Sequence, residues 1–256
     1  MIVDAHCHIW SYDAVAYYGN KPLFVYMQEH GIDKAALICM SEAENQRMRE
    51  LVSRFPDRLY GVSYVDFSNL DASLEKLRAD VKSGVSKAVK LYPYFEHFSV
   101  DDRALHPFYE TACELELPVI PHLGWVNMDE DRSCGHTGKY QYTGFPPQYG
   151  TVLEAFPQLK LVFTHLGGNY YYEFLTMAER FPNVVMETAW LADYCRRQFP
   201  VWDLHDWIRH AIGFVGAGRV IFGGEGVFPE DIVKLRLHAC DTAKILGENA
   251  RRYFKL

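Results

Sequence analysis

The sequence lacks the features that direct a chain to a membrane or to nucleic acid. No apolar run approaches the roughly 18 residues that a membrane-spanning helix needs. The first expected strand starts at Ile2, which leaves no room for the charged and apolar regions of a signal peptide. A formal net charge of −7, without lysine or arginine runs between aromatic residues, gives no basic field for nucleic acid. We therefore expect a cytoplasmic protein that binds a small molecule and neither nucleic acid nor membrane.

Paired cysteines are missing as well. The six cysteines are scattered along the chain, and no two of them form a C-x-x-C pair. This argues against a disulfide framework or a structural zinc knuckle and fits a reducing compartment. No internal repeat, low-complexity segment or interdomain linker is visible, and a hydrophobic content of 49% in 256 residues is enough for one large core.

What the chain does contain is an alternation of strand and helix patterns. The strand-like runs are nearly continuous in apolar residues, which indicates a parallel sheet covered on both faces. Eight such runs in about 250 residues predict a single-domain α/β fold, a (β/α)8 TIM barrel spanning 1–256. The expected strands lie at residues 1–8, 35–40, 59–65, 87–92, 118–123, 160–166, 183–189 and 219–224. Apolar residues at helical spacing predict helices around 48–55, 70–81, 105–112 and 174–181.

Two connections are longer than the usual ~2 to 6 residues, namely 125–147 after the fifth strand and 190–203 after the seventh. Active sites of such barrels lie at the carboxyl ends of the strands, so both segments should rim the site. Trp125, Tyr142 and Arg196 in these segments are therefore candidate substrate-binding residues. Ordinary surface insertion is the alternative for each of them.

The motif DAHCH places His6 and His8 one residue apart in the first strand. Side chains alternate along a strand, so both rings point the same way, which in a barrel strand is inward. Two neutral imidazoles in a packed interior need a partner for their lone pairs, and a divalent metal ion provides one. Core histidines bonded to main chain or water are the alternative. Asp4 is expected on the same face, where it would either orient a ligand or cap the bottom of the barrel.

Two further histidines end expected strands. His122 closes the fifth strand and His165 the sixth, each at a position from which a side chain reaches the mouth of the barrel. The other seven histidines fall in expected helices or loops, where a solvated or packed role is the default. The sequence therefore predicts that four imidazoles converge.

With these motifs the chain resembles the amidohydrolase superfamily, and within it the amidohydrolase-2 branch related to aminocarboxymuconate-semialdehyde decarboxylase. The shared motifs cover almost the entire chain in the family's order: DAHCH, a lysine after the fourth strand, HLG, THLGG, RVIFG and the C-terminal ILGENARRYF. The resemblance implies a TIM barrel in which His6, His8 and His122 hold a metal ion. It also implies that His165 lies beside the ion as a catalytic acid/base or electrophilic group.

One position departs from the family's pattern. The family usually carries F-G-[ST]-D at the end of the eighth strand, where the aspartate is a metal ligand and general base, whereas Glu225 stands here. The extra methylene moves the carboxylate further from the strand and adds a rotatable bond. We predict Glu225 as metal ligand and catalytic base, directly or through a water. The alternatives are that it binds nothing or that the barrel has lost turnover.

Lys90 ends the fourth strand, and its chemical state decides whether the site holds one metal ion or two. Binuclear members of the superfamily carry a carbamate there that bridges two ions, and this modification needs a lysine with a depressed pKa. The other roles are a cation for an anionic substrate or a partner for Glu187. We favour one ion and an unmodified, catalytic Lys90, with Tyr92 and Glu187 as candidate substrate-binding residues. Lys90 followed by Tyr92 and Pro93 is more typical of predicted hydrolases of this branch than of its decarboxylases.

The ligand set predicts the chemistry. Zinc, with manganese as the other candidate, lowers the pKa of a bound water when it is held by imidazoles and a carboxylate. The main hypothesis is a metal-dependent hydrolase of an amide, lactone or ester bond in a small carboxylated substrate, with Glu225 as base and His165 at the oxyanion or leaving group. The alternative is a metal-dependent non-oxidative decarboxylase of an aromatic or unsaturated acid, and the third hypothesis is a barrel without turnover. A homodimer stays open.

Overall fold

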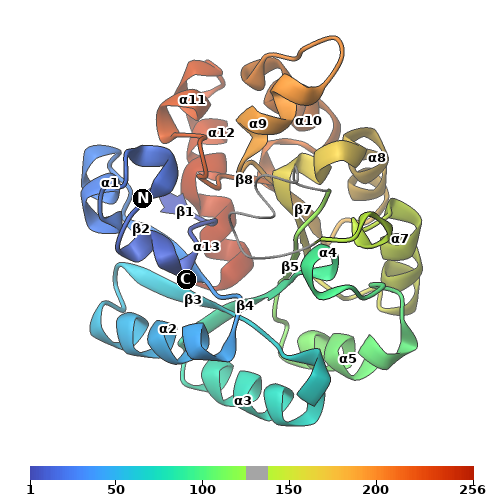
Figure 1. Ribbon diagram of the computed structural model, residues 1–256. Coiled ribbons are helices and arrows are strands. Elements are labelled where there is room, and N and C mark those ends of the chain that lie inside the picture. The colour runs from blue at the N-terminus through green and yellow to red at the C-terminus, as the bar shows by residue number, and fades with distance from the viewer. Residues whose placement is uncertain (125–137) are drawn as a thin grey trace.

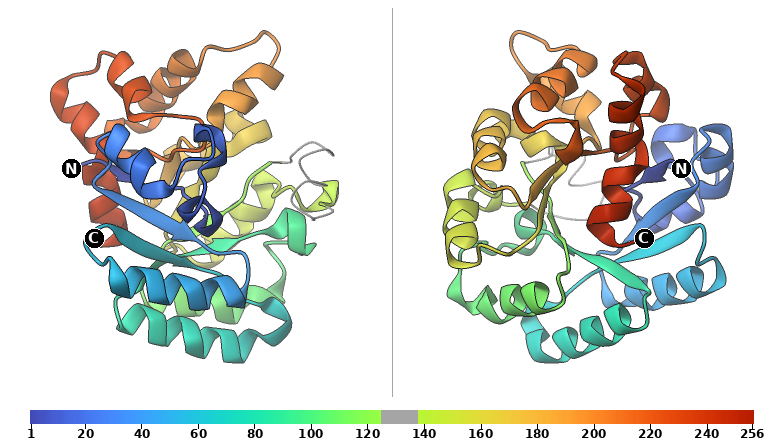
Figure 2. Two further views of the ribbon diagram at one scale, coloured as in Figure 1. Left: turned by 60° about the vertical axis from the view of Figure 1, so that its left-hand side comes forward. Right: turned by 180° about the vertical axis from the view of Figure 1, so that it is seen from behind.

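Eight parallel strands form one sheet in which each strand pairs with the next along the chain. The computed structural model describes residues 1–124 and 138–256. Helices surround the sheet (Figure 1), and two further views show the strands curling about a common centre (Figure 2). All eight expected strands and the TIM barrel are confirmed. The strands are β1 (Val3–Asp4), β2 (Lys34–Ile38), β3 (Leu59–Ser63), β4 (Ser86–Leu91), β5 (Val119–Pro121), β6 (Leu161–Phe163), β7 (Val184–Glu187) and β8 (Val220–Ile221).

The four helices predicted from apolar spacing are present as α2 (Glu42–Arg54), α3 (Leu70–Lys82), α5 (His106–Glu114) and α8 (Tyr171–Arg180). Ser41 caps α2, because its hydroxyl accepts the Glu44 N–H at 3.2 Å and so satisfies a donor that the helix leaves free. No helix in the described ranges is long and apolar enough to cross a membrane. The other α-helices of these ranges are α1 (Leu23–Glu29), α4 (Pro93–Glu96), α7 (Pro146–Ala155), α9 (Leu191–Arg197), α10 (Leu204–Val215), α11 (Pro229–Lys234), α12 (Ala239–Ala243) and α13 (Asn249–Phe254).

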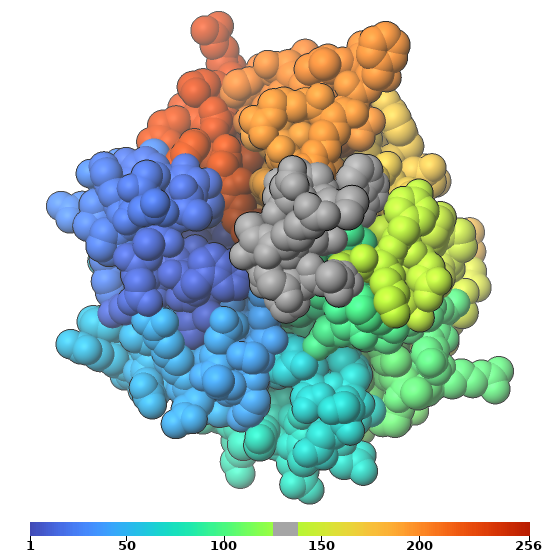
Figure 3. Space-filling view, in the orientation of Figure 1, coloured from blue at the N-terminus to red at the C-terminus, as the bar shows by residue number. Residues whose placement is uncertain are grey.

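The barrel closes where the first and last strands meet. The Ala5 N–H donates to the Phe222 carbonyl at 3.1 Å. In the ribbon and space-filling views the blue N-terminal segment accordingly lies beside the red C-terminal segment (Figures 1 and 3). This closure places the DAHCH motif next to the residues that follow β8, so that Glu225 reaches the histidine pair.

Two apolar layers hold the barrel together. Outside the barrel, side chains of the strands pack under the helices, as Phe163 of β6 does against Phe174 of α8 with ring centroids 4.5 Å apart. Inside it, side chains of the opposite parity pack against one another and against α13. This interior layer includes Val3, Ala36, Val62, Ala88, Tyr92, Val162 and Phe254. The interior is therefore filled below the mouth by apolar side chains, and the buried histidines lie at the carboxyl ends of the strands.

The backbone leaves the extended conformation at three strand ends. His165 after β6, Trp190 after β7 and Glu225 after β8 have φ angles of 57°, 52° and 50°. Residues other than glycine seldom adopt this left-handed region, and such strain concentrates at functional sites. These turns also explain why β6, β7 and β8 are shorter than their apolar runs, since the ladder stops before the polar side chains at the mouth.

Candidate metal centre

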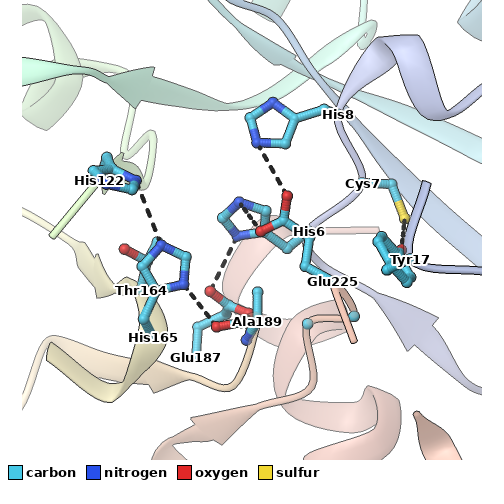
Figure 4. A network of polar contacts seen from close by, with 12 residues as sticks. His6, Cys7, His8, Tyr17, His122, Thr164, His165, Glu187, Ala189 and Glu225 are labelled. Atoms are coloured by element: carbon cyan, nitrogen blue, oxygen red, sulfur yellow. Dashed lines mark hydrogen bonds and ion pairs between the residues drawn. The ribbon is translucent and has the colours of Figure 1, made fainter. Parts of the chain in front are cut away.

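Two histidines and a glutamate direct their side chains to one point at the mouth of the barrel (Figure 4). Ligand atoms of His6, His8 and Glu225 all lie within 4.8 Å of one another. Nε2 of His6 is 3.6 Å from Oε2 of Glu225, and Nε2 of His8 is 3.5 Å from Oε1. Ligands about 2.1 Å from a tetrahedral ion are about 3.4 Å apart, so this spacing suits one metal ion.

Glu187 of β7 sets the orientation of His6. Its Oε2 accepts a hydrogen bond from Nδ1 of His6 at 3.1 Å, and both side chains are only 1% exposed. With the proton on Nδ1, the lone pair of His6 lies on Nε2, the atom that faces Glu225. The other carboxylate oxygen of Glu187 accepts the Ala189 N–H. Sequence analysis predicted that Glu187 binds substrate, but in the structure both of its oxygens accept hydrogen bonds from the protein, one of them from the predicted metal ligand His6.

His165 is oriented by the main chain. Its Nδ1 donates to the Ala189 carbonyl at 2.6 Å, so in the neutral ring the lone pair lies on Nε2. That Nε2 is 3.5 Å from Nδ1 of His122, and the ring centroids of His165 and His6 are 5.5 Å apart. The four predicted imidazoles therefore do meet.

His122 occupies the outer edge of this group. It is not one of the residues whose ligand atoms lie within 4.8 Å of one another. Its Nε2 is buried and has no hydrogen-bond partner in the part of the chain that the structure describes. His122 remains the predicted further ligand, with a free nitrogen for that role.

Burial keeps the four imidazoles neutral. The pKa of each lies well below its usual range, mainly because burial penalises the charged form and also because Lys90 is nearby. Neutral imidazole is the form that binds a metal ion. Burial raises the pKa of Glu225 to about 8, while Lys90 acts in the opposite direction. Neutral nitrogen donors beside a carboxylate suit zinc or manganese.

Asp4 connects the two strands that carry this cluster. Its Oδ1 accepts the N–H groups of His6 at 3.0 Å and Gly224 at 2.8 Å, and its Oδ2 accepts the hydroxyl of Tyr26 in α1 at 3.0 Å. The prediction that Asp4 shares the face of the histidines is wrong. Val3 packs inside the barrel, so Asp4 faces α1, and the regular strand ends at Asp4, which shifts the alternation before His6.

Two glycines before Glu225 make room for the neighbouring carboxylates. A Cβ atom on Gly224 would lie 2.5 Å from Oδ2 of Asp4, and one on Gly223 would overlap the carboxylate of Glu187. The sequence Gly-Gly-Glu at the end of the eighth strand is therefore a steric requirement of this arrangement.

Lys90 and Tyr92 enter the site from β4 and the residue that follows it. They are two positions apart, so both face the interior, and they are 1% and 2% exposed. Nζ of Lys90 lies 5.5 Å from the centre of the Tyr92 ring, which is itself 6.4 Å from the ring of His8. The structure thus places both predicted residues beside the histidines.

The remaining predicted substrate-binding residues are placed differently. The Arg196 side chain is 72% exposed and pairs with Asp193 at 2.7 Å on α9, so its position does not support a role in the site. Tyr142 is half-buried, and its ring centroid lies 6.1 Å from that of His97. Trp125 lies outside the described residues.

Trp10 is a rim residue that sequence analysis missed. Its ring stacks on His8, with centroids 4.0 Å apart and planes 10° from parallel. It is 41% exposed, so part of its face is open to solvent. Its place two residues after the histidine pair was the available signal, but the turn that brings it back over His8 has no sequence pattern of its own.

A closed barrel with neutral imidazoles and carboxylates at the carboxyl ends of its strands defines a TIM-barrel enzyme built for a metal ion. The sequence model of the amidohydrolase family, described as Amidohydrolase, matches residues 3–256. The protein belongs to the amidohydrolase family, in its amidohydrolase-2 branch, as the motifs predict.

Similar proteins include enzymes that act on carboxylic acids. Over 155 residues the chain is 25% identical to 2-keto-4-carboxy-3-hexenedioate hydratase from Sphingobium sp., a match that covers 56% of this chain and 45% of that relative. The solved 2,6-dihydroxybenzoate decarboxylase from Rhizobium is 16% identical, with a TM-score of 0.72 over 99% of this chain and 98% of its own. Dihydroxybenzoic acid decarboxylase from Polaromonas sp. JS666, solved with manganese and 2-nitroresorcinol, is also 16% identical, with a TM-score of 0.72 over 100% and 97%. At these identities the structural likeness shows the shared fold.

Proposed function

We propose that the protein is a metal-dependent lyase that removes carbon dioxide from a small aromatic or unsaturated carboxylic acid. The observation that carries this proposal is the convergence of His6, His8 and Glu225 within 4.8 Å, beside His165. Decarboxylases share the fold over nearly their full length, and one of them holds manganese. These relatives favour decarboxylation, the alternative in the sequence analysis, over hydrolysis, which was the main hypothesis.

His6, His8 and Glu225 would hold one divalent ion, with His122 as a further ligand. When bound, the ion supplies Lewis-acid polarisation of a substrate oxygen. Glu187 keeps the lone pair of His6 directed into the site through the hydrogen bond at Nδ1. Zinc and manganese both suit these donors, and manganese is the first choice for the test because a similar barrel binds it.

His165 is the proposed proton donor. Loss of carbon dioxide breaks a carbon–carbon bond and leaves an electron pair on the substrate carbon, which must then take up a proton. The hydrogen bond from Nδ1 to Ala189 leaves Nε2 as the atom at which His165 gains and releases that proton. The neutral ring first takes this proton at Nε2 from water, and because burial lowers the pKa of His165 the protonated ring then passes it readily to the carbon.

Addition of water to a carbon–carbon double bond is a second candidate, because the sequence relative is a hydratase. Burial raises the pKa of Glu225 to about 8, which suits a carboxylate that takes a proton from water near neutral pH. Hydrolysis of an amide, lactone or ester would use the same base and is the third candidate. A barrel without turnover is the result if all three reactions fail.

One panel of substrates separates these reactions. Manganese-loaded and zinc-loaded protein is given aromatic acids, unsaturated diacids and lactones, and carbon dioxide release, water addition and ring opening are measured on each. We expect carbon dioxide release from an acid. Water addition without carbon dioxide would support the hydratase instead, and absence of turnover on the whole panel would contradict the proposed enzyme.

Three histidine variants connect turnover with the site. His165→Ala is expected to keep its metal and lose turnover, whereas His6→Ala is expected to lose the metal. His238→Ala, which changes an exposed histidine before α12, serves as the control and should retain both. Turnover at the normal rate in His165→Ala would remove the proposed proton donor.

A further inference from the structure

We propose that Lys90 and Tyr92 form an anion-binding subsite that takes a carboxylate group of the substrate. The inference rests on the proposed function and narrows the substrate to acids whose carboxylate reaches the end of β4. It assigns Lys90 a role in substrate recognition, distinct from pairing with a carboxylate of the protein or carrying a bridge between two metal ions.

Lys90 has a buried charge without a hydrogen-bond partner among the described residues. The residue is 1% exposed, and its Nζ makes no hydrogen bond within residues 1–124 and 138–256. An ammonium group has three donors, and burying it unpaired is costly. Burial accordingly lowers the pKa of Lys90. A buried polar group without a partner calls for an explanation, and a ligand that brings the hydrogen-bond acceptor into the site provides one.

Glu187 and Glu225, the carboxylates that the structure describes near Lys90, already have other partners. One oxygen of Glu187 accepts the His6 ring N–H and the other accepts the Ala189 N–H. Both oxygens of Glu225 face ring nitrogens of the histidine pair. A metal ion held there would repel the ammonium group, so it cannot satisfy Lys90. The missing acceptor has to be an anionic or strongly polar oxygen.

Tyr92 supplies a second donor on the same face. Its hydroxyl is buried and, like Nζ of Lys90, has no partner in the described parts of the chain. Nζ lies 5.5 Å from the centre of the Tyr92 ring. One carboxylate group has two acceptor oxygens, which can take one donor each. A neutral carbonyl group offers one oxygen without charge and fits this pair less well.

Paired acids and amides test the subsite without requiring turnover. Binding of 2,6-dihydroxybenzoate and an unsaturated diacid, and of their primary amides, is measured by calorimetry on the manganese-loaded protein. Wild type should bind at least one acid more tightly than its amide. Lys90→Met should weaken binding of that acid about 10- to 100-fold, the effect of one lost charge-assisted hydrogen bond, and leave the amide unchanged. Tyr92→Phe should weaken it less, because its donor is neutral.

A lysine on the same strand provides the matched control. Lys87 lies three positions before Lys90 in β4, on the outer face, and is half-buried. Lys87→Met makes the same chemical change and should leave acid binding as in wild type. Metal affinity is measured in each variant, and Lys90→Met should bind manganese at least as tightly as wild type because a positive charge has been removed.

Three results would overturn the subsite. The first is an unchanged preference for acid over amide in Lys90→Met, and the second is that no acid binds to wild type. The third is a lower melting temperature of metal-free Lys90→Met, which would show that the ammonium group stabilises the fold. Lys90→Gln, which keeps a donor, should recover part of the acid binding. If the subsite holds but no lyase reaction is found, the proposed function fails and the substrate class survives.

Discussion

Replacing Glu187 with glutamine tests whether this carboxylate prepares His6 for a metal ion. Glu187 accepts the Nδ1 hydrogen of His6 at 3.1 Å, and both side chains are 1% exposed. Glutamine keeps the volume of glutamate and an oxygen for the Ala189 N–H. However, an amide nitrogen turned toward Nδ1 would move the His6 proton to Nε2, and an amide oxygen there would make a weaker, neutral bond.

The expected effect follows from the type of bond. A buried hydrogen bond to a charged group contributes about 1.5–3 kcal/mol. At about 1.4 kcal/mol for each factor of ten, Glu187→Gln should weaken metal binding about 10- to 100-fold. The metal-free fold should not lose stability, because burial raises the pKa of Glu187, which means that its charged form is disfavoured in the folded state.

Chelator competition with manganese and zinc at constant pH measures this effect, together with thermal unfolding of the metal-free protein. Asp80→Asn is the control, because Asp80 is also a buried carboxylate and is 7% exposed. It lies outside the site, where it forms an ion pair of 2.8 Å with Arg49. This variant should lose stability and keep its metal affinity. A Glu187→Gln protein that binds both ions as tightly as wild type would show that His6 does not depend on Glu187.

The remaining predictions concern protons, close packing and the core. Metal affinity should fall at least tenfold per pH unit below pH 8, because binding displaces a proton from Glu225 and favours the ionised form of Glu187, and burial raises the pKa of both to about 8, while the imidazoles are already neutral. Chelator competition at pH 6, 7 and 8 should show this slope, and Glu225→Gln should reduce it. Gly223→Ala should weaken metal binding because its Cβ overlaps the Glu187 carboxylate, whereas Gly213→Ala, in open space on α10, should not. Phe163→Ala should lower the free energy of unfolding by about 3–5 kcal/mol in urea titrations.

The apolar pattern was sufficient to predict the barrel. Strand and helix periodicities report which faces of a segment are buried, so the eight strands and the four patterned helices could be located from sequence. The ends of the strands could not. His165 and Glu225 leave the extended conformation because the closed barrel holds their side chains at its mouth, and no local pattern predicts a positive φ at a histidine or a glutamate.

The sequence by itself determined that His6, His8, His122 and His165 would meet, because the carboxyl ends of parallel strands lie at one rim. Only the tertiary structure decided which groups surround them. The bond from His6 to Glu187 joins residues 181 positions apart, and it depends on the closure that places the first and seventh strands on either side of the eighth. The same closure leaves the inward charge of Lys90 without a partner among the described residues, because the positions of the neighbouring strands decide which groups come within reach of it.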